Sequence, residues 1–389
     1  MKVLHICTSG EYTEGFSYQD NLITKYMSRS GIDTYIIASP LSYNSHGETV
    51  HVDVPCRYIN KDGVKVTRLP FHKPERFGRF LRSLEGFYKE VQRIEPNVIF
   101  YHNPQTSDSA VIAKYCKKNP DVKVFADNHA DFSNSATNWL SKTVLHGLIW
   151  RYYVNVLNKY TIRYYGVLPA RVDFLKNVYK VPVNKCDLLV MGGDDEIVER
   201  TMREENRIKL RKKYHIQDDD FLIVTGGKID AWKTQTVLLM QAVKAIDNPS
   251  LKLIVFGSVD KTLINQVNEL TDGNRIQYIG WVQSNESYEL FSISDLVVFP
   301  GRHSVYWEQV VAQGIPMIVK HWNGTTHVDI GGNVRYLYKD DMDEIRENIR
   351  ELMEKPEQYK CMLEAARSDM RKAFLYSSIA KRSIHVPEE

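Results

Sequence analysis

The stretch that decides the fold covers residues 221–234 and reads FLIVTGGKIDAWKT. A short apolar run is followed by two glycines, and a helical pattern begins at about Thr234. Paired glycines at the end of a buried strand allow the backbone to approach a ligand closely. Lys228 and Lys233 follow them, where both ammonium groups can converge on one diphosphate, and a helix start adds partial positive charge. A turn with two solvated lysines is the alternative that this stretch alone leaves open.

Short apolar runs alternate with amphipathic helical segments on both sides of this stretch. The first series of expected strands covers 3–6, 34–38, 64–69, 98–101 and 122–126, with helices expected at 21–30 and 81–93. The second series covers 222–225, 252–256, 276–278, 296–299, 317–319 and 334–336. Near-continuous apolar strands between helices are typical of parallel sheets that are covered on both faces. The sequence therefore predicts an α/β protein.

Two such series predict two doubly wound, Rossmann-like domains, and a length of 389 residues agrees with more than one domain. The expected domains are residues 1–195 and residues 196–375. Residues 376–389 are expected to form a tail that returns to the first domain. Ligands of such sheets bind beyond the carboxyl ends of the strands, so two facing domains are expected to share one cleft.

The composition excludes several classes of protein. A formal net charge of +3 gives no reason to expect nucleic-acid binding. The five cysteines are scattered without a C-x-x-C pair, which favours reduced thiols in a cytoplasmic protein. The opening MKVLHICTSG is too short in apolar residues for a signal peptide, and no apolar run approaches the ~18 residues of a membrane span. We expect a cytoplasmic protein, peripheral on the inner membrane face at most.

Residues 227–233 resemble the G-R-L-x-x-x-K-G element of the family 4-like (group 1) nucleotide-sugar glycosyltransferases of the GT-B fold. Gly227, Lys228 and Lys233 match that element, and lysine stands for arginine at Lys228, which keeps the charge and loses the bidentate fork. Further elements follow in the family's order at 256–258, 278–282 and 288–299. The resemblance implies an N-terminal acceptor domain and a C-terminal donor domain in which Lys228 and Lys233 bind the donor diphosphate.

The resemblance also implies roles for residues outside that element. Gly15 lies in the glycine-bearing loop that approaches the donor phosphates, and Val282 belongs to the segment beside the nucleobase. His129 ends an N-terminal strand at the place of the family histidine that contacts the donor sugar near the reacting carbon.

The family's two glutamates, seven residues apart, are missing at their register. Gly301 stands at the first position and Gln309 at the second, and Glu308 is one residue early. We favour a divergent site in which His303 and Ser304 line the donor phosphates and sugar. Glu308 or Gln309 would then hold the ribose, since an amide can also hydrogen-bond a diol. The alternative is a decayed site that binds without catalysing.

A metal site is not expected. His327 and Asp329 have no third ligand at a diagnostic spacing, and isolated histidines are most often ordinary polar loop residues. The run 218–220, three aspartates, lies before a strand and is typical of a solvated turn. We therefore expect no metal and no cofactor beyond the nucleotide-sugar substrate.

The function that the resemblance implies is retaining, metal-independent transfer of a hexose. The donor would be a UDP- or GDP-sugar and the acceptor a glycan or lipid-linked glycan of a surface polysaccharide. His129, Lys228, Lys233 and Glu308 are the catalytic candidates. A catalytically inactive binding subunit and a nucleotide-sugar epimerase of the same fold are the alternatives. Basic and aromatic residues at 71–88 and 139–165 fit contact with an anionic membrane as well as they fit core-packed helices.

Overall fold

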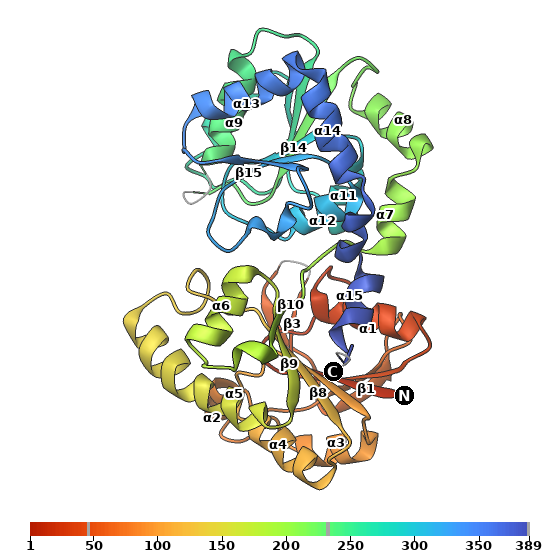
Figure 1. Cartoon of the computed structure of the whole chain (residues 1–389), viewed down its shortest axis with the longest axis vertical. Coiled ribbons are helices and arrows are strands. Elements are labelled where there is room, and N and C mark those ends of the chain that lie inside the picture. Colours follow the sequence, from red (N-terminus) through yellow and green to blue (C-terminus); the bar gives the residue numbers. More distant parts are fainter. Residues whose placement is uncertain (45–46, 231–233, 387–389) are drawn as a thin grey trace. The chain divides into compact units, whose positions relative to one another are not determined.

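The computed structural model describes residues 1–44, 47–230 and 234–386 of the chain. It divides into two compact units, which are described separately (Figure 1). Unit 1 consists of Met1–Val190 and Tyr376–Glu389, and unit 2 of Met191–Leu375. The division thus falls at Val190 and not after residue 195, and the last segment groups with unit 1.

Unit 1 is built on an eight-stranded sheet in the order β10-β9-β8-β7-β1-β2-β6-β5. All neighbours pair in parallel except β5, which runs antiparallel to β6 at the edge. The order reverses at β1, so the loops that leave β1 and β7 share a topological switch point, where ligands of such sheets bind. The strands are β1 Lys2–Cys7, β2 Asp33–Ala38, β5 Cys56–Ile59, β6 Lys65–Arg68, β7 Val98–His102, β8 Lys123–Asn128, β9 Thr161–Gly166 and β10 Cys186–Leu188; β3 Leu41–Tyr43 and β4 Thr49–His51 form a separate hairpin.

The helices of unit 1 differ from the sequence prediction at one place. The helix expected at 81–93 is wrong, because two short helices separated by a turn take its place. Arg82 ends the first of them in the left-handed conformation, with φ 54°. The helices are α1 Gln19–Arg29, α2 Glu75–Leu81, α3 Phe87–Ile94, α4 Asp108–Lys118, the π-helix η1 Ser141–Trp150, α5 Arg151–Asn158, α6 Pro169–Asn177, the 3-10 turn η2 Val183–Lys185 and α15 Tyr376–Ser383.

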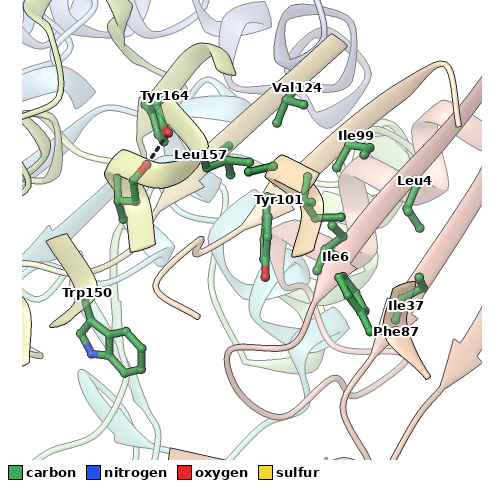
Figure 2. Packing of buried hydrophobic residues seen from close by; sticks show 14 of the residues in the cluster. Leu4, Ile6, Ile37, Phe87, Ile99, Tyr101, Val124, Trp150, Leu157 and Tyr164 are labelled. Carbon is green, nitrogen blue, oxygen red and sulfur yellow. Dashed lines mark hydrogen bonds between the residues drawn. The ribbon is translucent and has the colours of Figure 1, made fainter. Parts of the chain in front are cut away.

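The core of unit 1 lies between this sheet and its helices. Figure 2 shows apolar side chains of the central strands packed against Phe87 of α3 and Leu157 of α5. The side chains labelled in Figure 2 are at most 2% exposed. Burial of each of these large apolar side chains contributes about 1.5–3 kcal/mol to stability. The Tyr164 hydroxyl satisfies its polar end by donating to the Val154 carbonyl at 2.9 Å. Among the described residues, no helix has the length and hydropathy that a membrane span requires.

Unit 2 is built on a six-stranded, fully parallel sheet in the order β13-β12-β11-β14-β15-β16. This is the Rossmann arrangement, and its order reverses between β11 and β14. Each expected strand is confirmed: β11 Phe221–Gly226, β12 Leu251–Phe256, β13 Ile276–Tyr278, β14 Leu296–Phe299, β15 Met317–Lys320 and β16 Val334–Leu337. The helices are α7 Asp195–Thr201, α8 Glu204–Lys213, α9 Gln235–Ala245, α10 Ile264–Leu270, α11 Ser284–Ser292, α12 Tyr306–Gln313, α13 Met342–Glu354 and α14 Pro356–Ala366, with 3-10 turns η3 Thr326–Val328 and η4 Asp369–Phe374.

Candidate active site

The exits of strands β11 and β12 lie close together at the carboxyl edge of the unit 2 sheet. A side chain at Gly257 would meet the carbonyl oxygen of Gly227 at 1.9 Å, and the φ of Gly257 is +125°. Only glycine fits that position, because both the space and the backbone conformation exclude a Cβ atom. The Gly257 N–H also donates to the Gly280 carbonyl at 2.7 Å. Three successive strand exits are therefore joined at one edge.

Lys228 stands on the first of these exits. Its neighbour Ile229 is buried and donates its N–H to the Ser258 carbonyl at 2.8 Å, which fixes the loop against the β12 exit. The Lys228 side chain is 68% exposed and its Nζ lies 3.3 Å from Asp230 Oδ2. A fixed backbone thus carries an exposed cation beside the switch point of the sheet, as a phosphate site requires. The second predicted lysine, Lys233, lies outside the described residues.

Two further residues that were predicted to contact the donor lie on loops, one in each unit. Val282 is half-buried two residues after Gly280, in the loop that follows β13. In unit 1, Gly15 is exposed in the loop that follows β1, with φ +83°. Their contacts with a donor stay predictions.

Glu308 forms the centre of a closed cluster in unit 2. It lies in the first turn of α12 and is fully buried. Its Oε1 accepts hydrogen bonds from His303 Nε2 and from His327 Nε2, both at 2.9 Å. Burial alone would raise the pKa of Glu308, but the two facing imidazoles hold it well below its ordinary range. The carboxylate therefore joins the loop after β14 to the 3-10 turn after β15.

This arrangement corrects three sequence predictions. Glu308 has no exposed atom with which to contact a ribose or a reacting sugar in this conformation. Gln309 is also buried, and its Nε2 donates to Ser287 Oγ at 3.2 Å. His327 is not an ordinary loop histidine, because its side chain is 3% exposed and pairs with Glu308. His303 and Ser304 keep part of their surface, as lining residues would.

The same three groups could hold a metal ion, since their ligand atoms lie within 4.8 Å of one another. Glu308 is thus the third candidate ligand that sequence spacing missed. The hydrogen bonds favour another role. A metal-bound histidine usually donates its other ring nitrogen to a fixed partner, and His327 Nδ1 is buried without one among the described residues. Glu308 Oε2 is likewise buried and unpaired in the described structure.

A second cluster lies in unit 1 at the switch point. Asp127 Oδ2 accepts from His102 Nδ1 at 2.8 Å and lies 3.5 Å from His129 Nε2. The other oxygen of Asp127 accepts the Asn103 N–H at 3.1 Å. Behind them, His5 Nδ1 hydrogen-bonds His102 Nε2 at 3.1 Å. A buried chain of titratable groups thus ends at His129.

The charges of this chain follow from burial and proximity. Burial would raise the pKa of Asp127, but His102 and His129 hold it far below its ordinary range. Burial would lower the pKa of His102, and Asp127 outweighs burial and raises it. The pKa of His5 is lowered, first by burial and then by His102. Asp127 is therefore ionised, and His102 and His129 lie next to its carboxylate.

His129 opens into a cavity of about 360 Å³. Its side chain is 31% exposed, and its N–H donates to Asn103 Oδ1 at 2.9 Å. The lining also includes Ser9, Arg82, Gln105, Asn134, Ser135 and Trp150. The described lining holds no carboxylate, so the cavity offers donors and positive charge. Sequence analysis found His129 but not Arg82.

The comparisons with known proteins agree with this architecture. Residues 206–369 match the family model described as glycosyl transferases group 1. Unit 2 contains a glycosyltransferase group 1 domain. An uncharacterized glycosyltransferase of Methanocaldococcus jannaschii is 20% identical over 218 residues, which cover 54% of this chain and 55% of that protein. The chain thus spans about half the length of the curated relative that it matches.

Solved structures match the chain over nearly its full length. HepE of Anabaena in complex with UDP superposes with a TM-score of 0.67 at 16% identity, covering 98% of each chain. A glycosyltransferase from Rickettsia africae ESF-5 gives a TM-score of 0.67 at 14% identity, covering 98% of this chain and 96% of that one. At these identities the likeness shows the fold, which is GT-B, and the group 1 domain occupies its second unit.

Proposed function

We propose that this chain is a glycosyltransferase that takes a hexose from a nucleoside diphosphate held by its group 1 domain. The observation that carries the proposal is the glycine-fixed loop that presents Lys228 at the switch point of the unit 2 sheet. The HepE neighbour was solved with UDP, which supports a uridine diphosphate as the donor's nucleotide part, with a GDP-sugar as the alternative.

In glycosyl transfer, negative charge develops mainly on the leaving diphosphate. Departure of the diphosphate creates negative charge in an oxocarbenium-like transition state. A cation fixed beside that oxygen stabilises the transition state more than the ground state, an effect typically worth about 10²–10³-fold in rate. Lys228 and Lys233 supply this cation pair. We propose retention of anomeric configuration with no metal in the reaction, as the family resemblance implies.

The acceptor part of the proposal rests on unit 1. His129 lies at the carboxyl edge of β8, beside the cavity of about 360 Å³. Its Asp127 partner orients the imidazole toward that space, as a residue that contacts the donor sugar requires. We assign the glycan or lipid-linked glycan acceptor to this cavity, and a surface polysaccharide as the product.

Two measurements test the donor assignment. Thermal shifts across UDP-, GDP- and ADP-sugars identify the nucleotide, because a ligand that binds the folded state raises its apparent stability. The double variant Lys228→Ala with Lys233→Ala is expected to lose this shift and to reduce transfer by at least about 10²-fold. Lys209→Ala, an exposed lysine of α8, is the matched control. A double variant that binds UDP as tightly as the parent chain would overturn the site assignment.

A binding subunit without activity is the second candidate, and one observation favours it. Gly301 and the buried Gln309 occupy the positions of the family's two glutamates. The assay separates the two functions directly. A glycosyltransferase consumes the donor only with an acceptor present, whereas a binding subunit shows the thermal shift and releases no nucleotide with any acceptor. Product analysis without acceptor also detects an epimerase.

We further propose that unit 1 contacts an anionic membrane. Exposed aromatic and aliphatic side chains gather on α2 and the η1–α5 segment, namely Phe77, Phe80, Trp139, Leu140, Leu148 and Tyr152. Phe80 and Trp150 link the two segments, with ring centroids 6.3 Å apart. Arginines and lysines on the same segments suit an anionic surface.

Sedimentation with phosphatidylglycerol vesicles tests this contact. Trp139→Ser with Leu148→Ser is expected to weaken binding, whereas Ile59→Ser at the exposed edge strand β5 is the matched control. Absence of binding at low salt would end the membrane proposal, and the transfer proposal would stand.

A further inference from the structure

Arg82 is held in an unusual backbone position at the edge of the cavity. It follows α2 with φ 54° and ψ 47°, a left-handed conformation that costs a non-glycine residue about 1–3 kcal/mol. The two residues that follow it are fixed: Ser83 donates its N–H to the Gly78 carbonyl at 2.8 Å, and Leu84 donates its N–H to Asp108 Oδ2 at 3.0 Å. The chain therefore keeps this side chain in place against local strain.

The guanidinium has few internal partners. Its Nη1 donates to the Gln105 carbonyl at 3.1 Å, and its charge lies over the Trp150 ring, 5.0 Å from the centroid. An arginine has five N–H donors, so several have no protein acceptor in the described part of the chain. No carboxylate of the described residues forms an ion pair with it.

Two other poorly exposed arginines of the chain pair with carboxylates, whereas the buried Arg68 is held by carbonyl oxygens and by the Tyr58 hydroxyl. Arg171 Nε pairs with Asp131 Oδ2 at 3.0 Å, and Arg211 Nη1 with Asp295 Oδ2 at 3.2 Å. Burial lowers the pKa of Arg82, which still stays protonated near neutral pH because an arginine starts so high. Arg82 is only partly buried and makes a single hydrogen bond among the described residues, so its remaining donors can bind an anion that enters the cavity.

Arg82 lines two cavities of unit 1. One is the cavity of about 360 Å³ that it shares with His129, and the other, of about 180 Å³, lies beside Ser9 and Arg79. His146 lines the first cavity as well, and burial followed by the charge of Arg82 lowers the pKa of His146 to about 4. Near neutral pH that imidazole is uncharged, which leaves Arg82 as the fixed cation of the first cavity.

We propose that the acceptor sugar carries an anionic group, a carboxylate or a phosphate, which pairs with Arg82 while His129 lies beside the reacting centre. This inference rests on the proposed function, because it takes the unit 1 cavity as the acceptor site. The planar guanidinium can donate two parallel hydrogen bonds to either oxyanion. Acceptor selection is then set by charge in unit 1, independently of the diphosphate contact in unit 2.

The test compares matched sugars in the Lys228→Ala, Lys233→Ala background, so that the donor lysines do not contribute. Methyl glucuronide and a glucose phosphate report carboxylate and phosphate separately, and methyl glucoside is the neutral probe. We expect at least one anionic probe to bind about 10-fold more tightly than the glucoside by calorimetry, as a charge-assisted hydrogen bond predicts. The preferred anion identifies the acceptor's group.

Arg82→Gln is expected to remove the preference, and Arg76→Gln, an exposed arginine of α2, is the matched control. Arg82→Lys keeps the charge without the fork and is expected to retain part of the preference, which guards against a misfolded glutamine variant. A parent protein that binds all three probes equally would overturn the inference. So would a preference that survives in Arg82→Gln. UDP binding by the wild-type chain tests the proposed function separately, since failure there leaves the Arg82 result intact.

Discussion

Each unit contains a buried carboxylate between two histidines, and the two clusters differ in what they leave open. In unit 2, Glu308 receives two hydrogen bonds of 2.9 Å, and the more exposed of its histidines, His303, is 13% exposed. In unit 1, Asp127 binds His102 at 2.8 Å, but His129 lies 3.5 Å away and is 31% exposed at a cavity. The same chemical groups thus form a closed connection in one unit and an open site in the other.

The two clusters also differ in whether the second carboxylate oxygen has a hydrogen-bond partner. Asp127 Oδ1 accepts the Asn103 N–H at 3.1 Å, whereas Glu308 Oε2 is buried without a partner among the described residues. The open cluster therefore has a complete internal network and a histidine to spare for a ligand. In the closed cluster both histidines direct Nε2 to the carboxylate. This difference agrees with the proposal that His129 acts at the reaction site, while Glu308 connects two loops of unit 2.

The largest expected effect is on stability, at Glu308. Glu308→Ala removes the acceptor of two buried donors and is expected to cost about 3–5 kcal/mol in free energy of unfolding. Urea unfolding at pH 7 measures this loss, and Glu347→Ala on the exposed face of α13 is the control. Because the pKa of Glu308 is lowered in the folded state, its ionisation stabilises the fold at pH values above its unfolded pKa of about 4.3. This stabilisation is lost as the pH falls through the folded-state pKa. The difference between the two proteins should therefore shrink in acid.

If Glu308→Ala unfolds like the parent chain while nucleotide affinity collapses, Glu308 is a donor ligand and the comparison fails.

His129→Ala is expected to show the opposite behaviour. If His129 contacts the transition state as proposed, its removal should reduce kcat by about 10²-fold. The melting temperature should change little, because His129 is part-exposed and its backbone N–H bond to Asn103 stays. His327→Ala serves as the counterpart: it should lower the melting temperature and leave the residual turnover of folded protein much closer to the parent value. Equal losses of stability in the two variants would remove the distinction between open and closed clusters.

Asp127→Asn sharpens the comparison through pH. The raised pKa of His102 stabilises unit 1 below the unfolded value of about 6.5, and this is lost as the pH rises through the folded value. The lowered pKa of Asp127 stabilises above about 3.9 and is lost in acid. The free energy of unfolding of the parent chain should exceed that of Asp127→Asn by the largest amount between about pH 4 and 6.5. Urea unfolding at several pH values, with exposed Asp121→Asn as control, checks this; a difference that does not vary with pH contradicts it.

The smallest expected effect is that of chelation. If the Glu308 cluster is a hydrogen-bonded connection, dialysis against EDTA should leave transfer and unfolding unchanged. Elemental analysis should find well below one equivalent of zinc, and His303→Ala should not alter that amount. One equivalent that disappears in His303→Ala would show that the closed cluster is a metal site.

The sequence predicted the strands of unit 2 and the central strands of unit 1, because most are apolar runs that end at a glycine or polar residue, as at Gly226. It did not predict β9 or the outer strands β5 and β10, whose apolar runs are interrupted by polar residues. It missed the break after Leu81, since a left-handed arginine leaves no compositional signal. The Lys228 loop could be predicted because its strand, its paired glycines and its lysine follow one another directly in the sequence. The link between Glu308 and His327 could not, because the two residues are 19 positions apart and meet only where two strand exits share one sheet edge. For the same reason sequence spacing discarded His327 as a ligand.

Helix α15 has a consequence for how the protein is made. It packs against α1, and its Arg382 Nη2 donates to the Leu188 carbonyl at 3.0 Å, although the whole of unit 2 precedes it in the chain. During synthesis the group 1 domain emerges before unit 1 receives this helix. Domains tend to fold as they leave the ribosome, so unit 2 is expected to be formed while unit 1 still waits for its last element. A ribosome that stops before Tyr376 would therefore release a complete unit 2 attached to an unfinished unit 1.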